Sequence, residues 1–323
     1  MLELARVVKE ERMKKSPVII LWVISLCLMV TGCKKREDAP SAFSGTAISA
    51  DGVPIKYEVR GKGEPALVFV HGWCCDRSYW SAQLPYFARN HLVLAIDLAG
   101  HGESGLDRTE WTMGSFGEDI VAVVRKLNLD KIVLIGHSMG GPAVIEAARR
   151  LPAPIIGLVL VDSLTDFEYR IPQPAIDERL ARLRADFAGV VKKSVVETMF
   201  TFNTDAALVE KIAADMSSAP PAVGIGAMKM MIDWVNNNLI KAVQEAKTPI
   251  TCINSDVNPT KVEINQRYAP GFKAKIMSGV GHFNMIEAPD LFNNLLEETV
   301  KEYEQDSAKK LDGEKAQHSH FAY

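Results

Sequence analysis

The feature that most constrains the fold is a serine placed between an apolar run and a helical run. Residues 131–135 (KIVLI) suit a buried β-strand, residues 136–141 read GHSMGG, and residues 142–150 (PAVIEAARR) have helical spacing. A serine flanked by glycines at such a junction is typical of a sharp strand-to-helix turn, because a Cβ on either side would meet neighbouring backbone. A hydroxyl exposed there can attack a carbonyl carbon when a base removes its proton. Ser138 is therefore the predicted nucleophile.

The composition is that of an ordinary globular protein and argues against one class of partner. The 323 residues are 47% hydrophobic and 24% charged, which suits one large domain or two smaller ones with a sizeable core. The formal net charge of −3 gives no basic surface for nucleic acid. A small-molecule substrate is the expected partner, and nucleic acid is not.

The N-terminal region, residues 1–32, is predicted to be a targeting segment outside the fold. Its apolar run, residues 18–30, follows two lysines and is too short for a comfortable membrane span. The run ends in VTGC, which resembles the lipobox of a bacterial lipoprotein signal. That resemblance implies that Cys33 is lipidated after cleavage and anchors the protein to a membrane of the bacterial cell envelope. An ordinary signal peptide or a short anchor is the alternative, and Met13 is a more typical start than Met1.

A polar segment, residues 33–44, is predicted to tether the anchor to the domain. The domain itself then holds only Cys74, Cys75 and Cys252. Three is an odd number, neighbouring cysteines are poorly placed to bridge each other, and no zinc spacing is present. We expect packing roles for these cysteines, and the sequence implies neither a metal nor a cofactor.

Short apolar runs with strand character alternate with amphipathic runs along the domain. The predicted strands are residues 45–50, 54–60, 66–70, 91–96, 131–135, 157–161, 249–253 and 272–277. The predicted helices between and after them are residues 81–89, 116–127, 142–150 and 291–303. This alternation predicts an α/β fold with a mainly parallel eight-stranded sheet and helices on both faces.

One long segment interrupts the alternation. Residues 164–246 contain helical patterns broken by prolines, many of the methionines and no convincing strand. We interpret them as a helical cap inserted between two parts of the core, residues 45–163 and 247–304. A structural embellishment without a role at the site is the alternative. The charged stretch at residues 305–323 is predicted to be a disordered tail.

Four segments together resemble the α/β-hydrolase superfamily, and the resemblance spans residues 45–303. They are residues 71–73 (HGW), residues 97–104 (DLAGHGES), the turn at Ser138, and residues 279–283 (GVGHF). The resemblance implies an α/β-hydrolase fold with an inserted helical cap. Ala99 departs from the proline or arginine that family members often have there, which affects the shape of the loop rather than the chemistry.

The base and the oxyanion donors follow from the same segments. His282 lies on the predicted loop between the last strand and the last helix, and an imidazole can accept the serine proton and return it to a leaving group. The backbone N–H of Met139, which follows the nucleophile, is one expected oxyanion donor. The resemblance implies that the N–H of Trp73 is the other. His71, His101 and His137 are expected to support the backbone of their loops.

The acid that should orient His282 has two candidates. Asp256 follows the strand at residues 249–253, where many family members place it, and is the preferred one. The surrounding sequence departs from the usual G-x-x-D pattern, and an ungapped match would put Asn258 at the acid position. Asp162 ends another predicted strand, at a position used by relatives such as some haloalkane dehalogenases. Both acids remain open at this point.

These residues predict a serine hydrolase that cleaves carboxylic esters of small to medium apolar substrates through an acyl-enzyme on Ser138. Lactonase, carbon–carbon bond hydrolase, aminopeptidase and perhydrolase activities use similar motifs and are the alternatives. A binding protein that kept the pocket without turnover is a further alternative, which only the unusual acid motif favours.

Overall fold

The computed structural model describes residues 42–151 and 155–319. The predicted signal at residues 1–32, Cys33 and most of the tether lie outside the described residues. Within the part of the chain that is described, no helix combines the length and the apolar character needed to cross a bilayer.

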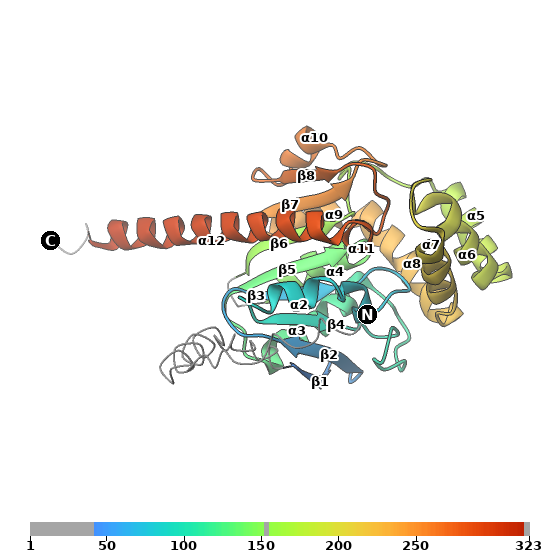
Figure 1. The fold of residues 1–323 in the computed structure, drawn as a ribbon, viewed down its shortest axis with the longest axis horizontal. Helices are drawn as coiled ribbons and strands as arrows, with labels where there is room; N and C mark the ends of the chain where they lie inside the picture. Colours follow the sequence, from blue (N-terminus) through green and yellow to red (C-terminus); the bar gives the residue numbers. More distant parts are fainter. Residues whose placement is uncertain (1–41, 152–154, 320–323) are drawn as a thin grey trace, which may run out of the picture. The chain divides into compact units, whose positions relative to one another are not determined.

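The core is one eight-stranded sheet in the order β1-β2-β4-β3-β5-β6-β7-β8 (Figure 1). The strands are β1 (Ala42–Ile48), β2 (Pro54–Arg60), β3 (Ala66–Val70), β4 (Val93–Ile96), β5 (Ile132–His137), β6 (Ile155–Val161), β7 (Ile250–Ser255) and β8 (Lys273–Met277). β1 and β2 are antiparallel to their neighbours, and the strands from β3 to β8 run parallel to one another. The predicted mainly parallel sheet of eight strands is confirmed.

The first strand corrects the predicted start of the fold. β1 begins at Ala42, so Ala42, Phe43 and Ser44, which were assigned to the tether, belong to the sheet. Their backbones pair with β2, from Ala42 opposite Arg60 onward, although their own side chains are exposed. The hydrophobic pattern missed them because ladder hydrogen bonds do not depend on buried side chains at a sheet edge.

Helices cover both faces of the sheet and bury its central strands completely. On one face α3 (Met113–Lys126) and α4 (Gly140–Ala148) pack against each other, and on the other α2 (Gln83–Phe87) contacts α12 (Pro289–Ser319). The short helices η1 (Arg77–Trp80), α10 (Val262–Gln266) and α11 (Asn284–Glu287) lie in connections. Every residue of β3, β4 and β5 is buried, which explains their continuous apolar sequences.

Five helices separate β6 from β7. They are α5 (Gln173–Ala185), α6 (Phe187–Thr198), α7 (Ala206–Ser217), α8 (Pro221–Asn237) and α9 (Leu239–Ala246). The helices α5 to α8 gather at one end of the sheet and form the cap, whereas α9 returns to the core and packs on α4 (Figure 1). The indole Nε1–H of Trp234 in α8 donates to Glu146 Oε1 of α4 at 2.6 Å and ties the cap to the core.

The C-terminal segment also corrects a prediction. The stretch expected to be a disordered tail from residue 305 continues α12 as far as Ser319. Low hydrophobicity alone suggested disorder, but Glu, Lys, Ala and Gln are good helix formers. Charge pairs at helical spacing, such as Lys309 with Asp306 at 3.5 Å, add to this preference.

Candidate active site

The turn that carries Ser138 is strained in the way its glycines predicted. Ser138 has a φ of 51° between β5 and α4, and its N–H donates to the carbonyl of Val161 at 2.9 Å. A Cβ on Gly136 would lie 2.3 Å from the Gly140 oxygen, and one on Gly140 would lie 2.6 Å from the Val70 oxygen. Only glycine fits at these two positions, and the turn leaves the Ser138 side chain partly accessible.

Asp162, the alternative acid, is the carboxylate that the structure places against His282. Asp162 Oδ2 lies 2.6 Å from His282 Nδ1. The other carboxylate oxygen, Oδ1, accepts the N–H of Ser255 at 2.7 Å. Asp162 directly follows β6 and has a φ of 42°, so its turn aims the side chain across the ends of the strands.

The charge of Asp162 matches the role of orienting an imidazole. Burial raises the pKa of Asp162, but the hydrogen bond and charge of His282 and the N–H of Ser255 outweigh it and leave this pKa below its ordinary value. The carboxylate is therefore ionised at neutral pH. It accepts the Nδ1–H of His282, which leaves Nε2 as the ring nitrogen available for proton transfer.

The preference for Asp256 as the acid is corrected by this geometry. Asp256 is exposed, follows the end of β7, and makes no hydrogen bond to His282 among the described residues. Asn258 instead lines a cavity of about 140 Å³ that also borders Asp162 and His282. The local sequence after β7 was a poor guide because the carboxylate that meets His282 follows the neighbouring strand, β6.

Both expected oxyanion donors are free of protein acceptors. Neither the Trp73 N–H nor the Met139 N–H donates to an acceptor within the described residues. Met139 is the N-cap of α4, where backbone N–H groups have no intrahelical partner. Gly72 brings the Trp73 loop against Ser138, since a Cβ on Gly72 would lie 3.1 Å from Ser138 Cβ.

His71 orients the peptide that carries the Trp73 N–H. The Leu98 N–H donates to His71 Nε2 at 3.0 Å, so the ring proton is on Nδ1 and donates to the Gly72 carbonyl at 2.8 Å. Burial lowers the pKa of His71 to about 4, which keeps the ring neutral. In a trans peptide the C=O and the next N–H point in opposite directions, so holding the Gly72 oxygen aims the Trp73 N–H away from His71.

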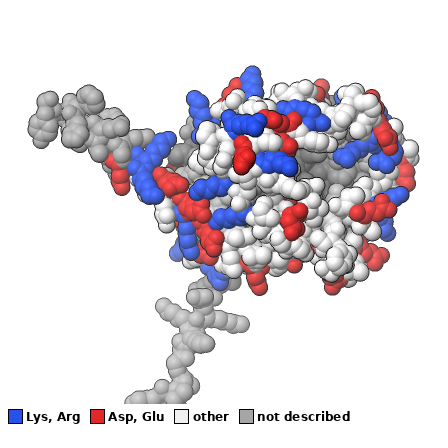
Figure 2. All heavy atoms as spheres, turned by 90° about the horizontal axis from the view of Figure 1, so that it is seen from above, with Lys and Arg blue, Asp and Glu red and all other residues white. Residues whose placement is uncertain are grey.

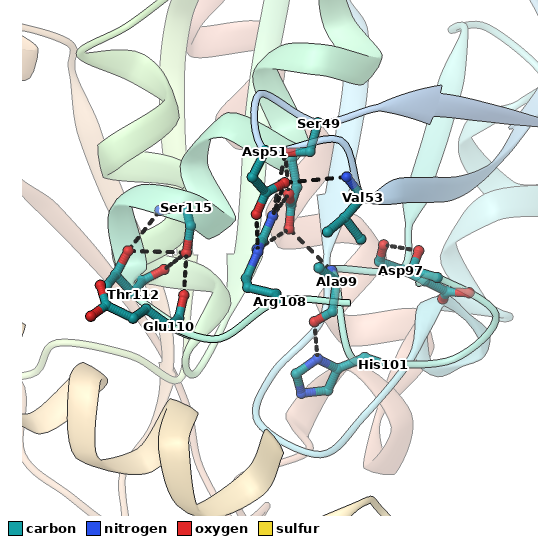
Figure 3. A network of polar contacts seen from close by, with 12 residues as sticks. Ser49, Asp51, Val53, Asp97, Ala99, His101, Arg108, Glu110, Thr112 and Ser115 are labelled. Atoms are coloured by element: carbon teal, nitrogen blue, oxygen red, sulfur yellow. Dashed lines mark hydrogen bonds and ion pairs between the residues drawn. The ribbon is translucent and has the colours of Figure 1, made fainter. Parts of the chain in front are cut away.

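A buried polar network holds the loop that supplies Leu98 (Figure 3). Asp119 accepts the Ala99 N–H at 3.0 Å and pairs with Arg108 at 2.6 Å. The Asp97 side chain accepts the Arg77 N–H at 2.8 Å. His101 lies against the Ala99 carbonyl, with Nδ1 3.0 Å from the oxygen. The segment DLAGHGES therefore supports the site from behind His71.

Two supporting contacts were not found from the sequence. Ser163 donates its hydroxyl to the Ser138 carbonyl at 2.7 Å and so joins the turn after β6 to the turn that carries Ser138. His137 Nε2 lies 2.9 Å from the His282 carbonyl oxygen and holds the histidine loop. Burial and nearby His282 lower the pKa of His137 to about 3. Only a general supporting role was expected of His137, and nothing in the sequence marked Ser163.

The Trp73 side chain faces the cap, and the two cysteines that follow it are buried. Trp73 Nε1–H donates to the Gly224 carbonyl of α8 at 2.7 Å, and the Trp73 ring packs edge-on against Phe187 at 6.1 Å. Cys74 and Cys75 are buried free thiols, and burial raises the pKa of each. In the described part of the chain no cluster of three His, Cys, Asp or Glu side chains is arranged to hold a metal ion.

Comparisons with known proteins agree with this architecture. The family model described as "Alpha/beta hydrolase family" matches residues 67–295, more than half of the chain. A pimeloyl-[acyl-carrier protein] methyl ester esterase of Legionella pneumophila is 23% identical over 249 residues, which is 76% of this chain and 99% of that protein.

Two solved structures share the fold. An esterase from Thermogutta terrifontis is 22% identical with a TM-score of 0.69, covering 81% of this chain and 99% of that one. An enzyme described as degrading N-acyl homoserine lactones is 25% identical with a TM-score of 0.65, covering 78% of this chain and 98% of its own. The eight-stranded sheet, the strained serine turn and the family match lead to one conclusion: the chain belongs to the alpha/beta hydrolase family.

Proposed function

We propose that the protein is a serine hydrolase that cleaves carboxylic esters through an acyl-enzyme on Ser138. The observation that carries this proposal is the 2.6 Å contact between Asp162 and His282 beside the strained Ser138 turn. In the proposed reaction His282 is the general base, Asp162 orients it, and the N–H groups of Trp73 and Met139 form the oxyanion hole.

The first half of the reaction forms the acyl-enzyme. Ser138 Oγ attacks the ester carbonyl carbon while His282 Nε2 accepts the hydroxyl proton. The resulting oxyanion receives hydrogen bonds from the N–H groups of Trp73 and Met139, each worth about 3 kcal/mol in the transition state. The bond to the alcohol oxygen then breaks, and His282 returns the proton to the departing alcohol.

The second half repeats these steps with water. A water molecule gives a proton to His282 Nε2 and attacks the acyl carbonyl carbon. The second tetrahedral intermediate uses the same two donors, and its collapse releases the carboxylic acid as the proton passes from His282 to Ser138 Oγ. Throughout, Asp162 stays ionised and stabilises the imidazolium, as its lowered pKa favours.

Apolar substrates of small to medium size suit the surroundings of the site. The ring of Phe187 in the cap packs against the ring of Trp73, whose backbone N–H is one of the two proposed oxyanion donors. Figure 2 shows Lys and Arg interspersed with Asp and Glu on the face it draws. The Legionella relative, named as a methyl ester esterase, also supports an ester.

Lactone hydrolysis is a second candidate, because the solved structure at 25% identity is described as a lactone-degrading enzyme. A lactone is an internal ester, so the same residues would act in the same order, and ring opening keeps the alcohol attached to the acyl group. The binding-protein alternative loses its support, since it depended on a missing acid and Asp162 meets His282.

Turnover of p-nitrophenyl acetate, butyrate and octanoate, and of acyl homoserine lactones, tests the proposal. We expect hydrolysis of the shorter esters and covalent labelling by a fluorophosphonate probe. Both should disappear in Ser138→Ala. Labelling that persists in this variant would exclude Ser138 as the nucleophile, and a folded protein that turns over no ester or lactone would exclude the esterase and lactonase assignments.

We further propose that Cys33 carries a lipid that anchors the protein in the bacterial cell envelope. The proposal is supported by the sequence before Cys33 alone. Metabolic labelling with a fatty-acid analogue should mark the full-length protein, and Cys33→Ala should remove the label. A wild-type protein that takes up no label would overturn the anchor.

A further inference from the structure

The backbone of His282 is held by the cap as well as by the core. Its N–H donates to the Met199 carbonyl at 2.7 Å, and its own carbonyl oxygen lies 2.9 Å from His137 Nε2. Met199 begins the segment between α6 and α7, residues 199–205, which we call the cap loop. The peptide that presents the predicted base therefore lies between one bond to the cap and one to the core.

Glu287 joins the histidine loop to the cap loop through one carboxylate. The N–H of Gly281 donates to Glu287 Oε1 at 2.9 Å, and the hydroxyl of Thr204 donates to Glu287 Oε2 at 2.7 Å. Glu287 ends α11, five positions after His282, and is half-buried. Each oxygen of the carboxylate thus serves a different loop, so a shift of the cap loop is passed to the residue before His282.

Close packing leaves little room for the two loops to slide past each other. A Cβ on Gly281 would lie 2.4 Å from the Met199 oxygen and 2.7 Å from Phe200 Cα. On the other side of His282, the Phe283 ring stacks on the Phe200 ring with centroids 5.4 Å apart and planes 27° apart. Both neighbours of His282 in the chain therefore contact the cap loop directly.

We propose that Glu287 is a positioning residue that couples the cap to the general base, so that His282 is correctly placed only while the cap loop is docked. This inference rests on the proposed function, because it assigns His282 the role of base. The cap is then part of the catalytic apparatus and not only a cover: moving the cap loop withdraws the acceptor of the His282 N–H and the Thr204 hydroxyl together.

Steady-state kinetics on the full chain tests the coupling. Glu287→Ala should lower kcat by about 30-fold and change KM by less than about threefold, because the base is misplaced while the substrate pocket is kept. Glu287→Gln should stay within about threefold of wild type, since its amide oxygen can accept from Gly281 and its N–H can donate to the Thr204 oxygen. Thr204→Val should lower kcat by about fivefold, and Thr204→Ser should not.

Glu297→Ala is the matched control, because Glu297 bonds Tyr86 and Lys301 on the core and, among the described residues, makes no hydrogen bond or ion pair to the cap loop. It should keep the wild-type kcat. A Glu287→Ala enzyme with wild-type kcat, or a Glu287→Gln enzyme as impaired as Glu287→Ala, overturns the proposal. If Glu287→Ala does not fold, the Thr204→Val and Thr204→Ser pair decides by the same criterion.

Hydrogen–deuterium exchange separates failure of the coupling from failure of the proposed function. Loss of the Glu287 bridge should accelerate amide exchange in residues 279–284 and 199–205 together, whether or not the protein hydrolyses any ester. An inactive wild-type protein with this response would exclude the hydrolase proposal and the role of His282 as a base, while keeping the coupling of the two loops. Unchanged exchange in both segments overturns the coupling.

Discussion

Two neighbouring parallel strands, β5 and β6, each lead into a residue other than glycine that has a positive φ: Ser138 at 51° and Asp162 at 42°. The nucleophile turn, residues 136–141, is surrounded by glycines that leave room for neighbouring backbone. The acid turn, residues 162–164, has no glycine. It is held by contacts with distant segments, such as the Ser255 N–H on Asp162, which joins positions 93 residues apart.

The comparison shows two ways of supporting a strained functional residue. In the nucleophile turn the support comes from glycines adjacent to Ser138 in the sequence, so it can be recognised as a motif. In the acid turn the support comes from hydrogen bonds to residues that are distant in the sequence. The Ser163 hydroxyl donates to the Ser138 carbonyl, and the Ser163 N–H donates to Asn254 Oδ1 at 3.2 Å. The two turns are therefore linked, and substitutions can test each separately.

The largest expected effect lies in the nucleophile turn. Ser138→Ala should lower kcat/KM for p-nitrophenyl butyrate by about 10⁴-fold or more, because no other group in the turn can form the acyl bond. Alanine tolerates the same φ as serine, so the variant should fold. Ser218→Ala, at an exposed position in the cap, is the control and should be fully active. Substantial residual turnover in Ser138→Ala would place the nucleophile elsewhere.

The acid turn should show the next largest effect. Asp162→Asn should lower kcat by about 10³-fold, because an amide neither holds the Nδ1–H tautomer of His282 nor stabilises its charge. Asp256→Asn should remain within about twofold of wild type, since its side chain is exposed and makes no hydrogen bond to His282 among the described residues. A larger loss of kcat in Asp256→Asn than in Asp162→Asn would identify Asp256, after β7, as the acid that orients His282.

Relocating the carboxylate asks whether the acid turn is the only place from which the imidazole can be oriented. Asn258 lines the same cavity as Asp162 and His282. Adding Asn258→Asp to Asp162→Asn should therefore recover about tenfold in kcat relative to the single variant, through electrostatic stabilisation of the imidazolium. No recovery would show that the strained geometry at Asp162, and not merely a nearby charge, is required.

The hydrogen bond from Ser163 to the Ser138 carbonyl, which links the two turns, should contribute to folding stability rather than to catalysis. A Cβ on Gly141 would lie 2.4 Å from Ser163 Oγ and 3.0 Å from Ser163 Cβ. Gly141→Ala should therefore lower the free energy of unfolding by about 1–3 kcal/mol, measured by urea denaturation. Gly271→Ala, where an added Cβ meets nothing within 4 Å, should change it by less than about 0.5 kcal/mol. Equal effects at both glycines would contradict the proposed contact.

The smallest expected effect is a difference between the two turns in the pH range over which each contributes to folding stability. Buried His137 has its pKa lowered from 6.5 to about 3, so protonation of the unfolded chain removes stability as pH falls below 6.5. Asp162 has a pKa lowered from 3.8, so its contribution is present above that value and lost as pH falls below it. Wild type should melt at a higher temperature than Asp162→Asn from pH 6.5 to 4.5, and the two melting temperatures should converge only below about pH 4. Convergence near pH 6 would contradict the assignment.

Much of the fold could be predicted because its signals are local. The strands from β3 to β7 are buried almost throughout, so apolar runs marked each of them. The start of β1 escaped because its first three residues are exposed and are held by backbone pairing with β2. The end of α12 escaped because a charged helix has no apolar pattern to reveal it.

By itself the sequence determined the class of fold, the sharp turn that carries Ser138, and the loop that carries His282, since each depends on short-range patterns of glycines and apolar residues. Only the tertiary structure decided that Asp162 rather than Asp256 meets the imidazole, and that Glu287 ties its loop to the cap. The physical reason is that such partners are selected by the order and stagger of strands and by packing of the cap. The distances between these side chains are set only when the whole chain has folded.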